Sequence, residues 1–380
     1  MRIAIDARPA LDPRRTGVGE YTRRILRHLP AADPLPEYVA WYLHARGLFR
    51  RRRLLGEAPP NLTEHPTRLP ARVFQPLSWR LGVPRLEWLG VDVDAFLATN
   101  FLPPATRIRG VVLVVHDLAY ERFPETAPQM DARWRRVFRR WLRRAGGVIV
   151  PSRSAERDLL AHHDVDPARV HVVPHGVEPF EAPDRSEVVA ASERFGIGGR
   201  YVLFVGGIEP RKNLHRLIEA FRRAQTDAWL VLAGGRTNWI PGEAGRLDHL
   251  VAALPPEVRD RVVLTGYVSE RHKRALLAGA EALAYPSLYE GFGLPVLEAF
   301  AADVPVLTSD ASSLPEVAGD AALLVDPRDV DAMTHGLERL LGDDGLREGL
   351  RRAGRERARA FRWETTARKT AEVLRAAAGL

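Results

Sequence analysis

The sequence lacks cysteine and has only three lysines among its 380 residues. Without cysteine, disulfide frameworks, zinc–thiolate sites and thiol nucleophiles are excluded, so any catalytic group is an oxygen or nitrogen group. No apolar run approaches the roughly 20 residues that cross a bilayer, and the spacing of the 12 histidines does not resemble a metal site. We therefore expect a cytoplasmic chain with no metal and no cofactor of its own.

The scarcity of lysine leaves arginine to carry the positive charge. All but three of the 56 basic residues are arginine, and 48 acidic residues leave a formal net charge of +8. Residues 1–180 carry a net charge of +10, whereas the rest of the chain carries −2. This asymmetry indicates two domains that face different partners, the first an anionic surface or acceptor. Because genome composition also produces arginine-rich chains, the charge does not indicate nucleic-acid binding, and we expect no nucleic-acid partner.

Short apolar runs alternate with amphipathic stretches along most of the chain, which is typical of strands separated by helices. Continuous apolar strands are buried on both faces, so they predict parallel sheets covered by helices. The expected strands are Ile3–Ile5, Ala95–Ala98, Val111–Val115, Val148–Val150, Val170–Val173, Tyr201–Val205, Trp229–Ala233, Val262–Thr265, Ala282–Tyr285, Val304–Leu307 and Ala322–Val325. The pattern predicts an α/β fold of two doubly wound, Rossmann-like domains that face each other across a cleft, where such sheets bind ligands.

The prolines between residues 174 and 183 interrupt the pattern and mark the join between the two series. We expect an N-terminal domain over residues 1–178, a C-terminal domain over 179–362 and a last helix over 363–380. The stretch Ala31–Glu64 gives a weak signal with proline and arginine clusters, so we expect loops there.

The strongest motif is Tyr-Glu-Gly-Phe-Gly-Leu-Pro-Val-Leu-Glu at residues 289–298, directly after an expected strand. Gly291 and Gly293 let the backbone approach a ligand, and the start of the following helix offers amide groups suited to a diphosphate. A carboxylate at Glu298 would repel a phosphate, so its expected partners are hydroxyls of a ribose or sugar. The alternative is that Glu290 and Glu298 are solvated carboxylates at a helix end.

A second motif is Gly-Gly-Ile-Glu-Pro-Arg-Lys-Asn at residues 206–213, between a strand and a helix. Backbone donors around Gly207 together with the cations Arg211 and Lys212 match the needs of a diphosphate. In a chain that almost always uses arginine, a lysine at this point indicates a specific task, such as reaching a single phosphate oxygen. The alternative is a solvated basic helix start.

Two features of the first domain point toward the same cleft. Gly17 and Gly19 open a helix after the first strand, but the third glycine of a dinucleotide fingerprint is missing, which argues against an NAD site. A glycine-lined lip near a donor phosphate and a plain flexible loop both stay open. His116 ends an apolar strand at the expected cleft, where a catalytic and a structural role both stay open, whereas His175 beside the join favours a structural role.

Apolar residues recur at helical spacing from Trp134 to Leu142, surrounded by arginines. The favoured interpretation is a helix that packs its apolar side on the core. The alternative is a helix that lies on an anionic membrane surface, with its aromatic side chains at the interface.

Taken together, these motifs resemble the retaining glycosyltransferases of family 4, which have the two-Rossmann GT-B architecture. The resemblance spans nearly the whole chain and also includes Val-Pro-His-Gly-Val at residues 173–177 and Pro-Ser-Arg-Ser at residues 151–154. It implies that the last helix crosses back onto the N-terminal domain. It implies catalytic roles for His116, Glu290, Lys212 and Arg211. The donor-binding residues that it implies are Gly17, Gly19, Gly207, Arg211, Lys212, Tyr267, Val268, Glu290, Gly291, Phe292, Gly293, Leu294 and Glu298.

The N-terminal half most resembles bacterial mannosyltransferases that make surface polysaccharides. This resemblance implies GDP-mannose as the favoured donor and a glycan or lipid-linked acceptor, with a peripheral contact to the inner face of an anionic membrane. It implies transfer with retention and without a metal. Since no protein nucleophile stands out in the sequence, we expect the acceptor to attack on the face from which the diphosphate leaves. A sugar phosphorylase and a nucleotide-sugar epimerase on the same fold remain the alternatives.

Overall fold

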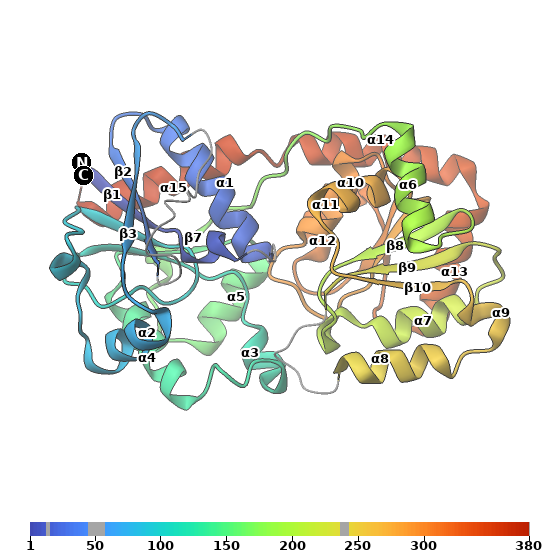
Figure 1. The fold of residues 1–380 in the computed structure, drawn as a ribbon, viewed down its shortest axis with the longest axis horizontal. Helices are drawn as coiled ribbons and strands as arrows, with labels where there is room; N and C mark the ends of the chain where they lie inside the picture. The colour runs from blue at the N-terminus through green and yellow to red at the C-terminus, as the bar shows by residue number, and fades with distance from the viewer. Residues whose placement is uncertain (13–15, 45–57, 236–242, 380) are drawn as a thin grey trace. The chain divides into compact units, whose positions relative to one another are not determined.

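The computed structural model describes residues 1–12, 16–44, 58–235 and 243–379, and it divides into two compact units. Unit 1 consists of Met1–Leu118, Gln129–Gly176 and Arg362–Leu380, and unit 2 consists of Ala119–Pro128 and Val177–Phe361. Each unit is built on one parallel sheet with helices packed on its faces (Figure 1). Within the described ranges, no helix has both the length and the apolar character needed to cross a membrane.

The sheet of unit 1 has the strand order β3-β2-β1-β4-β5-β6-β7. Its strands are β1 (Arg2–Asp6), β2 (Glu37–Leu43), β3 (Leu62–Thr67), β4 (Ala95–Ala98), β5 (Gly110–Val114), β6 (Gly147–Val150) and β7 (Val170–Val172), and its longer helices are α1 (Gly17–Ala32), α2 (Ala71–Leu81), α4 (Ala132–Arg144), α5 (Arg153–His162) and α15 (Trp363–Ala378). The strand order reverses between β1 and β4, which pair in parallel. A reversal of this kind separates the loops at the carboxyl edge and creates a binding position there.

The sheet of unit 2 has the strand order β10-β9-β8-β11-β12-β13, with the reversal between β8 and β11. Its strands are β8 (Tyr201–Val205), β9 (Trp229–Ala233), β10 (Val262–Gly266), β11 (Ala282–Tyr285), β12 (Val306–Ser309) and β13 (Leu323–Val325). Its helices are α3 (Ala119–Arg122), α6 (Arg185–Phe195), α7 (Leu214–Arg223), α8 (Glu243–Ala252), α9 (Pro256–Arg259), α10 (Glu270–Gly279), α11 (Leu294–Ala301), α12 (Leu314–Ala318), α13 (Val330–Gly342) and α14 (Asp344–Arg359). The two sheets confirm the predicted class of two doubly wound α/β domains.

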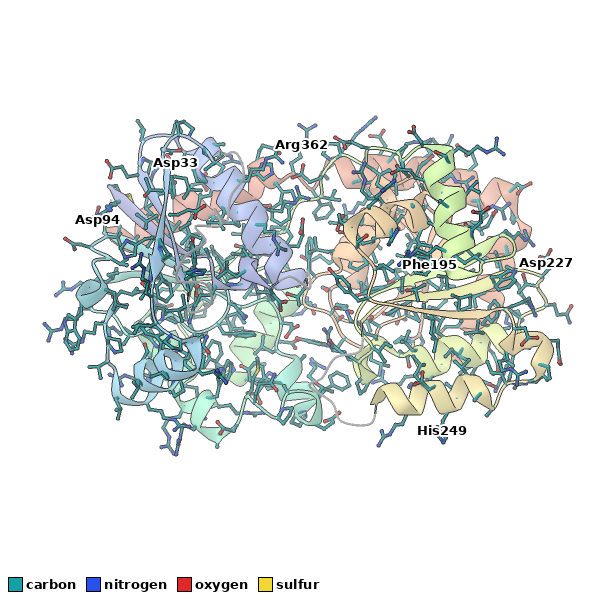
Figure 2. All side chains as sticks on the ribbon, viewed as in Figure 1. Asp33, Asp94, Phe195, Asp227, His249 and Arg362 are labelled. Atoms are coloured by element: carbon teal, nitrogen blue, oxygen red, sulfur yellow. The ribbon has the colours of Figure 1, made fainter. Side chains whose placement is uncertain are left out.

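The last helix, α15, belongs to unit 1, as expected. Trp363, Ala367 and Leu374 are buried in the same apolar cluster as Ile3 and Ile5 of β1. Arg375 of α15 forms an ion pair with Asp33, the residue that ends α1 and is labelled in Figure 2. The core of unit 1 therefore combines the first strand of the chain with its last helix.

Apart from the short segment Ala119–Pro128, the chain leaves unit 1 after Gly176 and returns to it after Phe361. The two passages lie side by side, because the Val177 amide donates to the Phe361 carbonyl at 3.0 Å. A Cβ atom on Gly176 would lie only 2.2 Å from the backbone nitrogen of Trp363, so this position requires glycine. The sequence analysis placed the corresponding boundaries after residues 178 and 362.

The structure differs from the sequence analysis in two segments of the first half. Residues Ala119–Pro128, which the sequence placed in the N-terminal domain, group with unit 2. The ring centres of Phe123 and Tyr289 lie 6.3 Å apart, and the Arg122 guanidinium lies 5.4 Å from the Tyr289 ring centre. The prediction of loops across Ala31–Glu64 is wrong where the chain forms the buried strand β2 and the start of β3. Residues 45–57 lie outside the described residues. The prolines that flank β2 interrupt its strand pattern in the sequence. β3 has a polar sequence that does not indicate a strand, and its position at the edge of the sheet allows Pro66.

We predict that Gly234→Ala destabilises unit 2. Gly234 follows β9, and a Cβ atom there would lie 1.6 Å from the carbonyl oxygen of Gly206, which follows β8. The two strand ends must then separate, at a cost of about 1–3 kcal/mol in the free energy of unfolding. Urea denaturation measures the change.

The matched control is Gly349→Ala within α14, where nothing lies within 4 Å of the added methyl group. This change removes a flexible residue from a helix, so the free energy of unfolding should stay level or rise by up to about 1 kcal/mol. Equal stabilities for the two variants would contradict the close approach of the β8 and β9 loops.

Candidate functional site

The cationic motif of unit 2 lies at the reversal of its strand order. Arg211 and Lys212 belong to the short turn Pro210–Lys212 that follows β8, and Glu290 follows the neighbouring strand β11. Because β8 and β11 are parallel neighbours, both loops emerge at the same carboxyl edge. The sheet therefore brings together two motifs that are 78 residues apart in the chain.

Asn213 holds the two loops in register. Its φ of 63° lies in the left-handed region, which ends the turn before α7 begins. Its buried side-chain amide donates to the carbonyl oxygens of Pro286 at 3.0 Å and Pro327 at 2.6 Å. The Leu288 amide also donates to the Arg211 carbonyl at 2.7 Å. The backbone beside the two cations is thus tied to the loop that carries Glu290.

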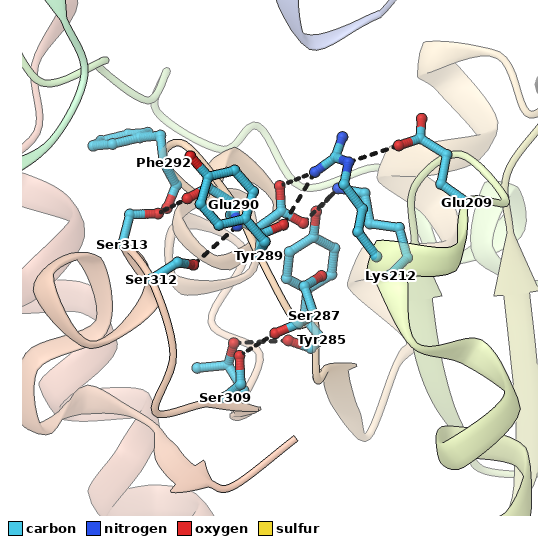
Figure 3. A network of polar contacts seen from close by, with 12 residues as sticks. Glu209, Lys212, Tyr285, Ser287, Tyr289, Glu290, Phe292, Ser309, Ser312 and Ser313 are labelled. Atoms are coloured by element: carbon cyan, nitrogen blue, oxygen red, sulfur yellow. Dashed lines mark hydrogen bonds and ion pairs between the residues drawn. The ribbon is translucent and has the colours of Figure 1, made fainter. Parts of the chain in front are cut away.

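A compact ion-pair network connects the charged side chains (Figure 3). Lys212 Nζ donates to Glu290 Oε1 and to the Tyr285 hydroxyl, both at 2.5 Å. Arg211 Nη1 donates to the other oxygen, Glu290 Oε2, at 2.9 Å. Arg211 Nε donates to Glu209 Oε2 at 2.7 Å. Each carboxylate oxygen of Glu290 is therefore engaged by a different cation.

Burial and the opposite charges shift the protonation equilibria of this network. Burial favours a higher pKa for Glu290, but Lys212 and Arg211 outweigh it and lower the pKa to about 2. Burial and the nearby Arg211 charge lower the pKa of Lys212, against the opposing effect of Glu290. Burial, with the Glu290 charge, raises the pKa of the Tyr285 hydroxyl. Glu290 is thus a permanent anion that compensates two cations inside the protein.

The glycine-rich loop after Glu290 leads directly into α11. The Glu290 amide donates to Ser312 Oγ at 2.9 Å, and the Ser313 hydroxyl lies 2.6 Å from the Phe292 carbonyl (Figure 3). Gly293 has a φ of +126°, which only glycine adopts readily, and Leu294 begins the helix. Since the first amides of a helix have no acceptor within it, this turn is a natural position for an anion.

Glu298, predicted to bind a donor hydroxyl, lies in α11 and forms an ion pair that the sequence analysis missed. Lys273 Nζ of α10 lies 2.7 Å from Glu298 Oε1 and 3.3 Å from Glu270 Oε2. Burial alone would lower the pKa of Lys273, but Glu298 and Glu270 raise it above the ordinary value. The rarity of lysine, which drew attention to Lys212, was the signal that could have found this residue.

The remaining predicted residues of unit 2 lie along the same carboxyl edge. Tyr267 and Val268 follow β10, and the Tyr267 side chain is 46% exposed. Gly207 follows β8, and the next amide, of Ile208, donates to the Gly235 carbonyl at 3.2 Å. Gly235 in turn lies close to the Tyr267 side chain. Gly207 and Tyr267 are thus linked through the loop that follows β9. The Phe292 side chain is buried, and its ring centre lies 5.9 Å from that of Phe361.

In unit 1, His116 lies in a buried aromatic cluster just after β5. Its Nε2 atom is 2.8 Å from the Thr99 carbonyl oxygen, and a carbonyl only accepts, so Nε2 carries the proton. Burial lowers the pKa of His116, so the ring is neutral near pH 7 and its Nδ1 atom is an acceptor. Its ring centre lies 4.9 Å from that of Tyr21 and 5.5 Å from that of His175. Burial lowers the pKa of His175 well below its usual value, and a protonated His116 would act in the same direction.

Gly17 and Gly19 begin α1 in the same unit. The Thr16 side chain accepts from the Gly19 amide at 3.1 Å and caps the helix. A Cβ on Gly19 would lie 2.9 Å from the Pro9 carbonyl oxygen, whereas Gly17 has open space. Packing therefore requires glycine at position 19, whereas a side chain at position 17 would meet no neighbour, and the predicted ligand contacts of both stay predictions. In the part of the chain that the structure describes, no three acidic or histidine side chains gather as a metal site would require.

We predict that Glu290→Gln lowers stability in a pH-dependent way. At pH 7 the variant leaves two buried cations with less compensation, which costs roughly 3–5 kcal/mol in the free energy of unfolding. Because the folded pKa of Glu290 lies near 2, below the ordinary value of 4.5, the wild-type chain loses this contribution as the pH falls from about 5 toward 2. The difference in the free energy of unfolding between the wild type and Glu290→Gln should become smaller over that pH range, as measured by urea denaturation. Glu356→Gln, at an exposed pair with Arg359, should change stability by less than about 0.5 kcal/mol. A gap that stays constant with pH would contradict the pairing.

Two protein-family models match the chain in succession. Residues 15–180 match the model described as Glycosyltransferase Family 4, and residues 190–357 match the model described as Glycosyl transferases group 1. Together they cover most of both units.

Individual relatives agree with these matches. The chain is 29% identical over 383 residues to O-antigen chain mannosyltransferase B of Escherichia coli, covering 97% of this chain and 98% of that protein. It is 33% identical over 289 residues to the MMP alpha-(1->4)-mannosyltransferase of Mycolicibacterium hassiacum, covering 69% of this chain and 64% of that protein.

Solved structures share the fold at low sequence identity. Sucrose-phosphate synthase from Thermosynechococcus elongatus superposes with a TM-score of 0.77 at 21% identity, covering 99% of this chain and 98% of that one. Anabaena HepE in complex with UDP-glucose gives a TM-score of 0.71 at 15% identity, covering 98% and 99%. The consecutive family matches, the relative that matches over its full length and the two doubly wound sheets agree, and the chain belongs to the group 1 glycosyltransferases of family 4.

Proposed function

We propose that the protein transfers a mannosyl group from GDP-mannose to a glycan or lipid-linked acceptor in the synthesis of a surface polysaccharide, with retention of configuration and without a metal. The observation that carries the proposal is the buried Lys212–Glu290–Arg211 network at the start of α11. The choice of mannose is supported by relatives whose names specify mannosyl transfer. The choice of guanine rests on the resemblance of the N-terminal half alone.

The network suits a diphosphate because its cations are assembled before the ligand arrives. Arg211 and Lys212 are held by Glu290 at 2.9 Å and 2.5 Å, so the geometry needs little reorganisation on binding. The first turn of α11 adds backbone dipoles that favour negative charge. In this proposal the two cations and the helix start stabilise the charge that develops on the leaving diphosphate.

The transfer step breaks the bond between the anomeric carbon and the β-phosphate oxygen, and that oxygen keeps the electron pair. The acceptor hydroxyl oxygen forms the new bond on the same face, and its proton passes to the departing phosphate oxygen. Glu290 is unsuited to act as a nucleophile, because both of its oxygens are bonded to cations and its pKa is held near 2. This supports same-face attack over a covalent glycosyl intermediate.

The ribose and the sugar have separate partners in the proposal. Glu298 accepts ribose hydroxyls through the oxygen that Lys273 does not hold, so Lys273 acts as a positioning residue. His116, neutral and protonated on Nε2, offers Nδ1 as an acceptor for a hydroxyl of the transferred sugar. Gly17 lines the donor from unit 1, and Tyr267 and Val268 meet the base.

We predict that GDP-mannose raises the unfolding temperature of the protein without added metal. At a hundredfold excess over Kd, one bound ligand contributes about 2.7 kcal/mol, or a shift of roughly 5–10 °C. UDP and ADP sugars at the same concentration should give smaller shifts. Lys212→Met should abolish the shift, whereas Lys369→Met in α15 replaces another of the three lysines and should keep it. A larger shift with UDP or ADP sugars would replace the guanine assignment, and no shift with any of them would contradict the donor site.

Product analysis separates the proposed reaction from its alternatives. A transferase releases GDP only when an acceptor is present, and NMR of the product should show the anomeric configuration of the donor. Formation of a sugar phosphate from a disaccharide and orthophosphate would indicate a phosphorylase. Conversion of the donor sugar without release of GDP would indicate an epimerase, and an inverted product would refute retention.

We predict that Lys273→Met raises the KM for the donor roughly tenfold with a smaller effect on kcat, because a lost charge-assisted hydrogen bond weakens ground-state and transition-state binding alike. Lys273→Arg should restore most of the affinity by keeping the pair with Glu298. Steady-state kinetics with varied donor concentration measure the split. An unchanged KM in a folded Lys273→Met variant would show that this ion pair has only a structural role.

A further inference from the structure

A short segment from the first half of the chain packs as part of unit 2. Residues Ala119–Pro128 belong to that unit, although the residues before and after them belong to unit 1. The segment consists of α3 and the turn Pro124–Thr126. Tyr120 of α3 is only 1% exposed, so the start of the segment is well packed. Unit 2 therefore contains side chains that its continuous stretch, Val177–Phe361, does not supply.

The backbone of this segment is fixed locally. The Phe123 amide donates to the Ala119 carbonyl at 2.7 Å, which closes α3. The Thr126 hydroxyl and amide both donate to the Phe123 carbonyl, at 2.7 Å and 2.9 Å. The side chains of Arg122 and Phe123 thus extend from a hydrogen-bonded turn, which limits where they can point.

Arg122 and Phe123 both contact the side chain of Tyr289, in the loop that follows β11. The central carbon of the Arg122 guanidinium lies 5.4 Å from the centre of the Tyr289 ring, within the range of a cation–π interaction. The Phe123 ring centre lies 6.3 Å from the same point, with 45° between the ring planes. Tyr289 is only 2% exposed, so its ring is enclosed. The segment therefore holds the residue that directly precedes Glu290.

The backbone of Tyr289 is part of the ion-pair network (Figure 3). Arg211 Nη1 donates to the Tyr289 carbonyl at 3.2 Å and to Glu290 Oε2 at 2.9 Å. Together with the bond from Arg211 Nε to Glu209, these acceptors set the plane of the rigid guanidinium. Of these three acceptors, only the Tyr289 carbonyl belongs to the backbone. It therefore ties the orientation of the guanidinium to the position of the loop.

Two contacts in succession connect Arg122 with Arg211. Arg122 packs on the Tyr289 ring, and the Tyr289 carbonyl accepts from Arg211. Loss of the first contact releases the ring and lets the peptide unit between Tyr289 and Glu290 tilt, which moves the carbonyl. Because an arginine binds phosphate through N–H groups that point in fixed directions, a small rotation of its plane reduces the fit.

We propose that Arg122 is a positioning residue for the donor diphosphate: through the ring and the carbonyl of Tyr289, it fixes the orientation of the Arg211 guanidinium. This inference rests on the proposed function, because the proposed function assigns Arg211 to the diphosphate. The competing role for Arg122, whose side chain is exposed, is direct contact with a phosphate of the donor or acceptor. The experiments below separate the two roles.

Steady-state kinetics of Arg122→Gln test the effect on the reaction. We expect kcat/KM for the donor to fall about fivefold, the size of one exposed cation–π contact. Most of the loss should appear in kcat, because Arg211 meets charge that develops on the leaving diphosphate. Arg122→Lys keeps a cation at the ring and should recover most of the activity. Wild-type kinetics in Arg122→Gln would overturn the proposal.

The matched control is Arg194→Gln in α6. Arg194 is another exposed arginine of unit 2, and its guanidinium lies 5.9 Å from the Phe195 ring centre. The control removes the same charge and the same kind of contact away from the network, so its kinetics should equal those of the wild type. An equal loss in both variants would show that net charge determines the effect, which would also overturn the proposal.

A double-mutant cycle with Tyr289→Leu shows whether Arg122 acts through the ring. In the Tyr289→Leu background, adding Arg122→Gln should lower kcat/KM by less than about twofold, because the contact is already lost. Tyr289→Phe keeps the ring and should leave the full effect of Arg122→Gln in place. A fivefold loss on adding Arg122→Gln to Tyr289→Leu would indicate direct contact of Arg122 with a substrate and would overturn the proposal.

Amide hydrogen exchange of the ligand-free protein gives a measurement that does not depend on turnover. The Leu288 amide donates to the Arg211 carbonyl at 2.7 Å and the Glu290 amide donates to Ser312 Oγ at 2.9 Å, so both report on the loop. Exchange of a peptide spanning 287–291 should be at least about threefold faster in Arg122→Gln than in the wild type or Arg194→Gln. Unchanged exchange would overturn the proposal. A wild-type protein that turns over no nucleotide sugar would instead refute the proposed function, and the exchange rates would still decide whether Arg122 holds the loop.

Discussion

The arrangement of unit 2 depends on the compensation of charge inside the protein. Arg211 and Lys212 are gathered at one sheet edge, and a buried cation without a counter-ion costs several kcal/mol. Glu290 supplies that counter-ion, with one oxygen for each cation at 2.9 Å and 2.5 Å. The two cations and Glu290 must also keep their positions, and hydrogen bonds from Asn213 and to Ser312 fix the loops that carry them. The two cations are thereby held in a fixed arrangement at the carboxyl edge of the sheet.

Electrostatic compensation also gives the two carboxylates of the motif different tasks. Glu290 is saturated by cations and serves to hold them, whereas Glu298 pairs with Lys273 alone and keeps one oxygen to accept hydrogen bonds. The strands β8 and β11 place Glu290 at the reversal of the strand order, and Glu298 lies further along the chain, within α11. In the proposed reaction, the start of α11 thus presents positive charge to the diphosphate and, one turn further along, an acceptor to hydroxyl groups.

Local sequence predicted the parts of this structure that local physics determines. Apolar runs gave β4, β8, β9 and β11 with the observed bounds, because buried parallel strands are continuous and their ends are marked by turns. The glycine and cation motifs singled out Arg211, Lys212 and Glu290, and the structure joins these three side chains in one ion-pair network. The pair between Lys273 and Glu298 escaped because it joins residues 25 apart on different helices.

The return of the chain to unit 1 after Phe361 has a consequence for its biosynthesis. Unit 2 is nearly continuous from Val177 to Phe361, so most of it emerges from the ribosome as one uninterrupted segment. Unit 1 begins first but lacks part of its core until α15 is made, because Trp363 and Leu374 pack with Ile3 of the first strand. The half of the protein that is translated first is therefore completed last, and its apolar surface stays unsealed for most of translation. Transiently exposed apolar surface of this kind is prone to aggregation until the core is complete.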